Sequence, residues 1–108
     1  MEKVLNRKVQ GIILSPVYEE LLRLSKDKSL KERKKALIAL KFLDVFDIIE
    51  IKRRQDETVD DLIIRYAKEW NYPVATNDRE LRRRLRDIEI AVVYLRQKSH
   101  LEVEGVIR

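Results

Sequence analysis

Residues 74–85 read VATNDRELRRRL, and this stretch decides the fold of the chain. A short apolar run ends in a Thr-Asn-Asp turn, and a strongly basic helix is predicted to begin at that turn. Asn77 is expected to cap the helix, with Glu80 three residues later completing a capping-box-like pair. Asp78 then occupies the first helical position, where free backbone N–H groups and the helix dipole favour a carboxylate. The stretch therefore predicts a strand-to-helix switch with an acidic residue at the end of the strand.

Strands and helices are predicted to alternate along the rest of the chain. Capping signals at Ser15-Pro16, Ser29 and Thr58 each precede an apolar pattern of helical period. The resulting order, β-α-α-β-α-β-α-β, indicates an α/β fold with parallel strands. The expected strands are 11–14, 46–51, 74–76 and 90–95, with a short edge strand at 101–103, and helices are expected to start near residues 15, 29, 58 and 78.

Composition narrows the class of protein. The 108 residues are expected to form a single domain, 1–108, because no Gly-, Pro- or Ser-rich linker divides them. A formal net charge of +5 favours polyanionic partners such as nucleic acid. The absence of cysteine excludes a disulfide framework and a thiolate metal site. No signal peptide or membrane span is recognisable, so a cytoplasmic protein without a membrane partner is expected.

Three acidic residues share a position relative to the predicted sheet. Glu20, Asp60 and Asp78 each lie in the helix that follows a strand. Helices that follow parallel strands start at the same edge of the sheet, so we expect these carboxylates to converge there. Carboxylates without His or Cys suit a hard cation such as Mg²⁺ or Mn²⁺. The alternative is that each acid only stabilises its helix start, which is worth roughly 0.3–1 kcal/mol.

Three segments together resemble the PIN-domain family of nucleases, and most of all its archaeal rRNA-processing branch. They are SPVYEEL at residues 15–21, TVDD at residues 58–61 and ATNDRELRRRLR at residues 75–86. The resemblance extends over nearly the whole chain, and the last segment is its most specific part. It implies a three-layer α/β/α fold with a parallel sheet.

The resemblance also implies an activity and a set of site residues. Members of the family hold one or two Mg²⁺ or Mn²⁺ ions with an acidic quartet and hydrolyse RNA phosphodiesters, in this branch during rRNA processing. The metal activates water and neutralises charge that develops on the phosphate. The residues that match the family's catalytic and metal-binding acids are Glu20, Asp60 and Asp78, and the supporting residues are Asp61, Thr76 and Asn77, the last two through hydroxyl or amide hydrogen bonds.

One part of the family pattern is missing. The family begins with a central strand that carries an Asp, and nothing before Gly11 matches it, since residues 1–10 read as the end of a helix and a turn. Loss of a central strand is expected to expose backbone groups and apolar surface, which a homodimer or strand exchange would cover. Because one metal ligand is absent as well, the sequence leaves enzymatic activity open.

Basic residues are expected to contact RNA next to the acidic edge. The alternative is a solvated helix face whose arginines pair with Glu80 and Asp87. Two other functions also fit: a catalytically impaired PIN-fold module for RNA binding or assembly, and the toxin nuclease of a toxin–antitoxin pair. The candidate RNA contacts are Arg79, Arg82 and Arg83 on the basic helix and Arg53 and Arg54 in the charged loop before the third helix.

Overall fold

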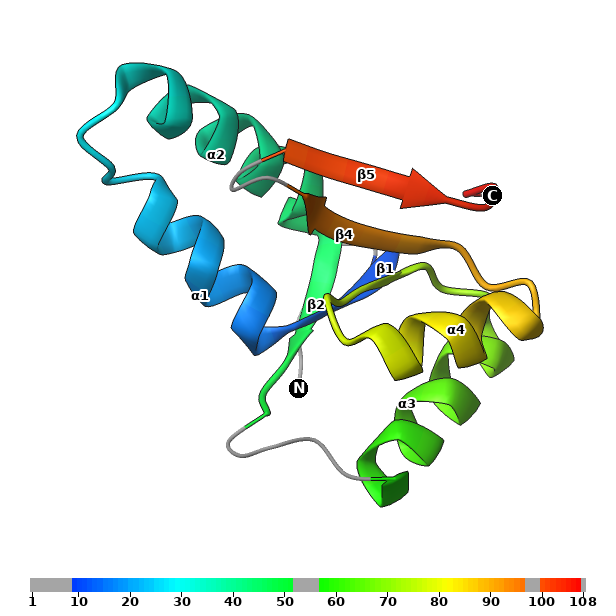
Figure 1. Ribbon diagram of the computed structural model, residues 1–108. Helices are drawn as coiled ribbons and strands as arrows, with labels where there is room; N and C mark the ends of the chain where they lie inside the picture. Colours follow the sequence, from blue (N-terminus) through cyan, green and yellow to red (C-terminus); the bar gives the residue numbers. More distant parts are fainter. Residues whose placement is uncertain (1–8, 52–56, 97–99, 108) are drawn as a thin grey trace.

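A computed structural model describes residues 9–51, 57–96 and 100–107. Strands and helices alternate along these residues, as the sequence predicts (Figure 1). Within them, no helix has the length and apolar character needed to cross a membrane. The elements are β1 (Gly11–Leu14), α1 (Ser15–Leu24), α2 (Leu30–Phe42), a 3₁₀ turn (Leu43–Val45), β2 (Phe46–Ile49), α3 (Glu57–Trp70), β3 (Val74–Ala75), α4 (Arg79–Asp87), β4 (Val92–Arg96) and β5 (His100–Glu104).

The described strands form one sheet in the order β2-β1-β3-β4-β5. The pairs β1–β2, β1–β3 and β3–β4 are parallel, and the edge strand β5 runs antiparallel to β4. Helices α1 and α2 cover one face of the sheet, and α3 and α4 cover the other (Figure 1). The fold is therefore the three-layer α/β/α arrangement that the PIN resemblance implies.

Alternating side chains of β1 divide the core between the two faces. Ile13 packs with Val17 and Leu21 of α1, whereas Ile12 and Leu14 pack with residues of α3 and α4. This alternation follows from the two-residue period of a strand. Because both faces of β1 are covered, all four of its residues are buried, which explains why it reads as a continuous apolar run.

The direct pairing of β1 with β3 settles how the centre of the sheet is built. Ile12 pairs with Val74 and Ile13 with Ala75, and the Ile12 N–H donates to the Pro73 carbonyl at 2.9 Å. No strand lies between β1 and β3 in the described sheet, so their facing backbone groups are satisfied by each other. The homodimer stays a prediction, but an open centre of the sheet is no longer the reason for it. The helix end expected within residues 1–8 lies outside the described residues.

The starts of α1 and α3 differ from the sequence prediction. Ser15 is inside α1 rather than its N-cap, and its Oγ instead accepts a hydrogen bond from the Ile51 N–H at 2.8 Å. A tertiary partner has therefore displaced the local cap. Helix α3 starts at Glu57, so Thr58 lies within it. The cap predicted at Ser29 is confirmed, because its Oγ accepts from the Glu32 N–H at 3.3 Å.

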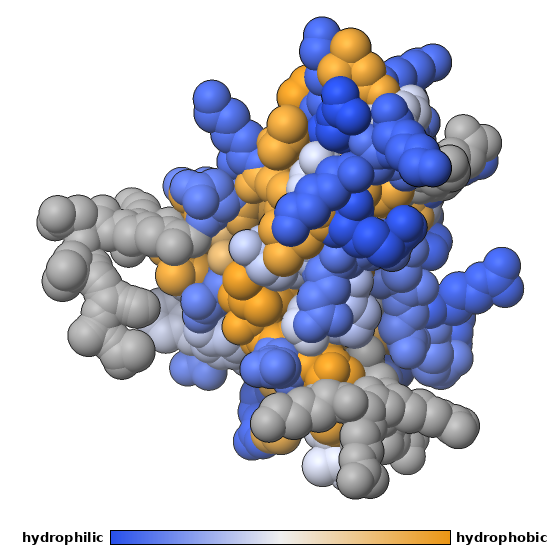
Figure 2. All heavy atoms as spheres, turned by 90° about the vertical axis from the view of Figure 1, so that its left-hand side faces the viewer, coloured by the Kyte–Doolittle hydropathy of each residue, from blue (hydrophilic) through white to orange (hydrophobic). Residues whose placement is uncertain are grey.

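Helix α2 leaves apolar side chains in contact with solvent. Leu37, Ile38 and Phe42 are 55%, 69% and 48% exposed, while Ala36 and Ala39 of the same helix are buried. Figure 2 shows a broken band of apolar side chains between charged ones on the side where α1 and α2 lie. This side of the molecule is thus less polar than an ordinary solvated helix layer.

Adjacent leucines of α1 test its orientation. Leu21 is fully buried and Leu22 is 38% exposed. Leu21→Ala is expected to lower the free energy of unfolding by about 2–5 kcal/mol, because it leaves a cavity in the core. Leu22→Ala makes the same change in helix propensity and is expected to cost about 0.5 kcal/mol or less. Urea unfolding of both variants provides the measurement, and equal losses would contradict the orientation.

Candidate functional site

Two helices start side by side at the carboxyl edge of the sheet. Strand β1 ends at Leu14 and runs directly into α1, and β3 ends at Ala75 and leads through residues 76–78 into α4. Since Ile13 pairs with Ala75, both connections leave the sheet at the same level (Figure 1). Open α/β sheets place their ligands at this edge, outside the carboxyl ends of the strands.

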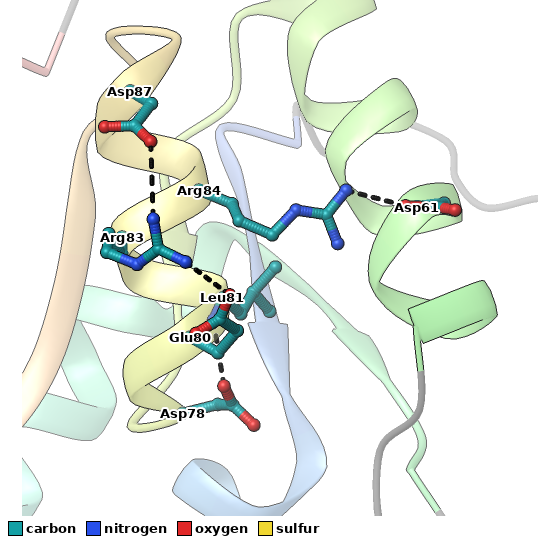
Figure 3. A network of polar contacts seen from close by, with 7 residues as sticks. All are labelled: Asp61, Asp78, Glu80, Leu81, Arg83, Arg84 and Asp87. Atoms are coloured by element: carbon teal, nitrogen blue, oxygen red, sulfur yellow. Dashed lines mark hydrogen bonds and ion pairs between the residues drawn. The ribbon is translucent and has the colours of Figure 1, made fainter.

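Asp78 lies at this edge as the N-cap of α4. Its Oδ1 accepts a hydrogen bond from the Leu81 N–H at 2.8 Å (Figure 3). The predicted cap, Asn77, lies one residue too early, and Glu80 pairs with Arg83 instead of completing a capping box. One oxygen of this carboxylate, Oδ1, therefore caps the helix, and the other, Oδ2, makes no hydrogen bond with the described residues.

Thr76 and Asn77 fix the turn that carries Asp78. Thr76 is buried, its N–H donates to the Val93 carbonyl at 2.9 Å, and its Oγ1 accepts from the Asp78 N–H at 3.1 Å. The Asn77 amide binds the main chain of Leu95 at two points, donating to its carbonyl at 3.1 Å and accepting from its N–H at 2.8 Å. The Thr76 main chain and the Asn77 side chain thus continue the β3–β4 pairing beyond the strand.

Asp60 and Asp61 are adjacent in α3 but face different surroundings. Asp60 is only 7% exposed and lies on the same helix face as the core residues Ile63 and Ala67. Asp61 faces α4, where its Oδ1 accepts a hydrogen bond from Arg84 Nη2 at 2.6 Å (Figure 3). Asp60 is therefore the inward carboxylate of the pair, and Asp61 ties α3 to α4.

Glu20 is engaged by a neighbour on its own helix. Arg23 donates two hydrogen bonds to its carboxylate, and the Glu20 side chain is 40% exposed. These hydrogen bonds, together with the charge of the guanidinium, lower the pKa of Glu20 against the opposing effect of partial burial. In the described conformation the Glu20 carboxylate is therefore bound to a residue of its own helix.

The structure therefore brings the predicted acids to one edge without gathering them around one point. Among the described residues, no three Asp, Glu or His side chains lie close enough to hold a metal ion together. The donor chemistry of Glu20, Asp60 and Asp78 still fits a hard divalent cation. Of these, Glu20 would have to leave Arg23 before serving as a ligand.

The predicted RNA-binding arginines are not equivalent. Arg83 pairs with Glu80 and Asp87 on the outside of α4 (Figure 3), which matches the solvated alternative. Arg79 is exposed, whereas Arg82 is half-buried with its guanidinium carbon 3.8 Å from the centre of the Tyr94 ring. Sequence reasoning missed Tyr94 and Leu95, whose roles arise only when β4 lies beside α4. Arg53 and Arg54 lie outside the described residues.

The chain belongs to the PIN-like domain family, whose model matches residues 1–98. Two archaeal relatives are similar to it over most of its length. Ribonuclease VapC4 of Methanocaldococcus jannaschii is 36% identical over 110 residues, which cover 99% of this chain and 82% of the relative. Ribonuclease VapC9 of Archaeoglobus fulgidus is 31% identical over 93 residues, which cover 86% of this chain and 66% of the relative. The resemblance seen in the sequence is confirmed.

The contribution of the Asn77–Leu95 contact to the stability of the protein can be measured. Asn77→Ala removes two side-chain hydrogen bonds and leaves Leu95 without them. We expect a loss of roughly 1–3 kcal/mol in the free energy of unfolding, measured in urea. Gln10→Ala is the control, because no hydrogen bond of that amide side chain is found with the described residues. Equal losses in the two variants would show that the contact does not hold the turn.

The Glu20–Arg23 pair predicts a pH effect. The folded-state pKa of Glu20 is depressed, so its stabilising contribution is present above the unfolded pKa and is lost as pH falls through the folded pKa. Arg23→Gln is expected to raise the pKa of Glu20 toward its ordinary value, as followed by NMR titration of the carboxyl group. Lys26→Gln removes the same charge without removing the pair and should leave the titration in place. An unchanged Glu20 midpoint in Arg23→Gln would contradict the pairing.

Proposed function

We propose that this chain is a metal-dependent endoribonuclease that uses Mg²⁺ or Mn²⁺ to hydrolyse RNA phosphodiesters. The observation that carries the proposal is the placement of Asp78. Its carboxylate is held at the carboxyl edge of β3 by the Leu81 N–H, while Oδ2 has no hydrogen bond to the described residues. Membership of the PIN-like family and two relatives named ribonucleases support this choice over other uses of such an edge.

The site residues in this proposal are those expected from the sequence, with roles assigned by their surroundings. Asp78 offers a pre-oriented oxygen, and Asp60 offers a carboxylate on the inward face of α3. Glu20 joins them when Arg23 releases it, while Thr76 and Asn77 keep the Asp78 turn in place. A bound divalent ion would supply an activated water and neutralise charge on the phosphate. Asp61 acts indirectly, through Arg84.

RNA is the proposed partner because the chain is basic and its arginines border the acidic edge. The net charge of +5 favours a polyanion, and Arg79 and Arg82 lie in the first turns of α4, directly after Asp78. The proposed homodimer is supported by the exposed apolar residues Leu37, Ile38 and Phe42 of α2. A cytoplasmic location is also part of the proposal, because no signal peptide or membrane span is recognisable in the sequence.

We keep the toxin nuclease of a toxin–antitoxin pair as a second, more specific candidate. Both relatives carry the VapC ribonuclease name, and neither name refers to ribosomal RNA. Ribosomal RNA processing is therefore the less supported of the two finer assignments made from the sequence. A small protein that co-purifies with the chain, and whose removal releases ribonuclease activity, would distinguish the toxin from the processing enzyme.

Cleavage of a single-stranded RNA in Mn²⁺ tests the nuclease directly. We expect cutting that is lost in EDTA and in Asp78→Asn, because the amide removes the negative charge offered to the cation. Asn is also a good N-cap, so this variant is expected to retain α4. The loss in activity should be at least about a hundredfold, which corresponds to roughly 2.7 kcal/mol in the barrier.

Asp87→Asn is the matched control for this measurement. It makes the same chemical change at the other end of α4, where Asp87 is 68% exposed and lies 3.9 Å from Arg83. Full activity is expected for it. A folded chain that binds the RNA but does not cut it in Mn²⁺ would contradict the nuclease and favour the RNA-binding module.

A further inference from the structure

We propose that Arg82 is the anchor for an RNA phosphate beside Asp78, and that the ring of Tyr94 holds its guanidinium for this purpose. The inference rests on the proposed function only in taking RNA as the ligand. It does not require that the chain cut RNA, and it separates Arg82 from the other arginines of α4 by geometry.

Arg82 and Asp78 are neighbours one helical turn apart. The Arg82 N–H donates to the Asp78 carbonyl at 2.9 Å, which closes the first turn of α4. Because Asp78 is the N-cap and has extended backbone, this hydrogen bond, and not a shared helix face, places the two residues one turn apart. A strand of RNA that reaches Asp78 with one phosphate therefore passes Arg82 with its neighbouring backbone.

Tyr94 fixes the orientation of the Arg82 side chain. The guanidinium carbon lies 3.8 Å from the centre of the ring, and Tyr94 is on the face of the sheet that α4 covers. A guanidinium stacked on an aromatic ring keeps its N–H donors in its own plane, where they meet acceptors at its edge. The stack thus orders the donors before a ligand arrives.

A donor of Arg82 has no acceptor. Its Nε is buried and makes no hydrogen bond within the described part of the chain. Buried polar groups are nearly always hydrogen-bonded, so this unsatisfied N–H needs an explanation. Nε itself is closed to a ligand, but the terminal nitrogens of the guanidinium are accessible and also make no hydrogen bond with the described residues, so they are the donors that a phosphate oxygen can reach.

The other arginines in the later turns of α4 already have acceptors. Arg83 pairs with Glu80 and Asp87, and Arg84 pairs with Asp61 (Figure 3). Arg86 donates to the Ile90 carbonyl at 3.1 Å. Arg79 is exposed and has no aromatic ring beneath it among the described residues. Arg82 alone in this described helix combines a fixed guanidinium with a missing acceptor.

The Asn77–Leu95 contact links the segment that carries Asp78 and Arg82 to the strand that carries Tyr94. Asn77 precedes Asp78 and binds the main chain of Leu95, which follows Tyr94. The acid, the arginine and its aromatic support are therefore linked by α4 on one side and by the β3–β4 connection on the other. A planar fork of N–H donors matches the oxygens of a phosphate or a carboxylate, and the net charge of +5 favours the phosphodiester of a polyanion.

Binding of a short fluorescent oligouridylate in EDTA tests the proposal without cleavage. Arg82→Gln is expected to weaken binding roughly tenfold, as for loss of a charge-assisted hydrogen-bonded contact. It should also reduce the slope of log K against log salt by about 0.7, the value for one phosphate of a single strand. Arg83→Gln removes the same charge from the outer face and is expected to change binding less than about twofold.

Two further pairs of variants separate geometry from charge. Arg82→Lys keeps the charge but loses the planar fork, so it should bind several-fold more weakly than the unaltered chain. Tyr94→Phe should retain binding and Tyr94→Leu should weaken it, with circular dichroism showing that both are folded. Equal binding by Arg82→Gln and Arg83→Gln, or full binding by Arg82→Lys, would overturn the role of Arg82. Such a result would leave the nuclease proposal standing, since manganese-dependent cleavage is measured separately.

Discussion

The hydrogen-bonded pairing of β1 with β3 is the constraint on which the candidate site depends. It aligns Ile13 with Ala75, so that α1 and α4 start from neighbouring strands at one edge of the sheet. Had β3 been paired elsewhere in the parallel sheet, α1 and α4 would still start at this edge but no longer from neighbouring strands. Pairing also satisfies backbone groups that would be costly to bury without partners. The fold and the position of the site therefore have the same cause.

Each candidate acid is stabilised by the protein in a different way. Asp78 accepts a backbone hydrogen bond at a helix N-terminus, and Glu20 pairs with Arg23. Asp60 lies on the core-facing side of α3, where it is only 7% exposed. Carboxylates that converge without a cation would repel each other and raise at least one pKa. Separate protein partners avoid this cost in the described conformation, and in the proposed function a divalent cation would compete with those partners.

Helix α4 shows how position gives one residue type several functions. Its arginines are alike in sequence, yet Arg83 faces solvent and pairs along the helix, while Arg84 crosses to α3. Arg82 lies over Tyr94 instead. Ion pairs on an exposed face contribute little to stability, about 0–1 kcal/mol each. The difference among these residues therefore has little effect on the free energy of folding.

Much of the architecture is encoded locally. The alternation of capping signals and apolar runs predicts the order of strands and helices, and the covered strand β1 reads as four apolar or small residues in a row. Gly11 shows the limit of such reasoning: a Cβ there would lie 2.6 Å from the Phe46 ring, a contact that no local pattern reveals. Ser15 is similar, because the distant Ile51 N–H takes the oxygen that the helix start was expected to use.

The sequence by itself determined the α/β class, the PIN resemblance and the acids at the strand ends, because these depend on residue type and spacing along the chain. Only the tertiary structure decided that Asp78 rather than Asn77 caps α4, that Asn77 binds Leu95, and that Arg82 rests on Tyr94. The Asn77–Leu95 and Arg82–Tyr94 contacts join residues brought together by the β3–β4 pairing and the packing of α4 on the sheet, and with Asn77 bound to Leu95 the cap falls to Asp78. Their partners are chosen by distance in space, which local sequence patterns do not encode.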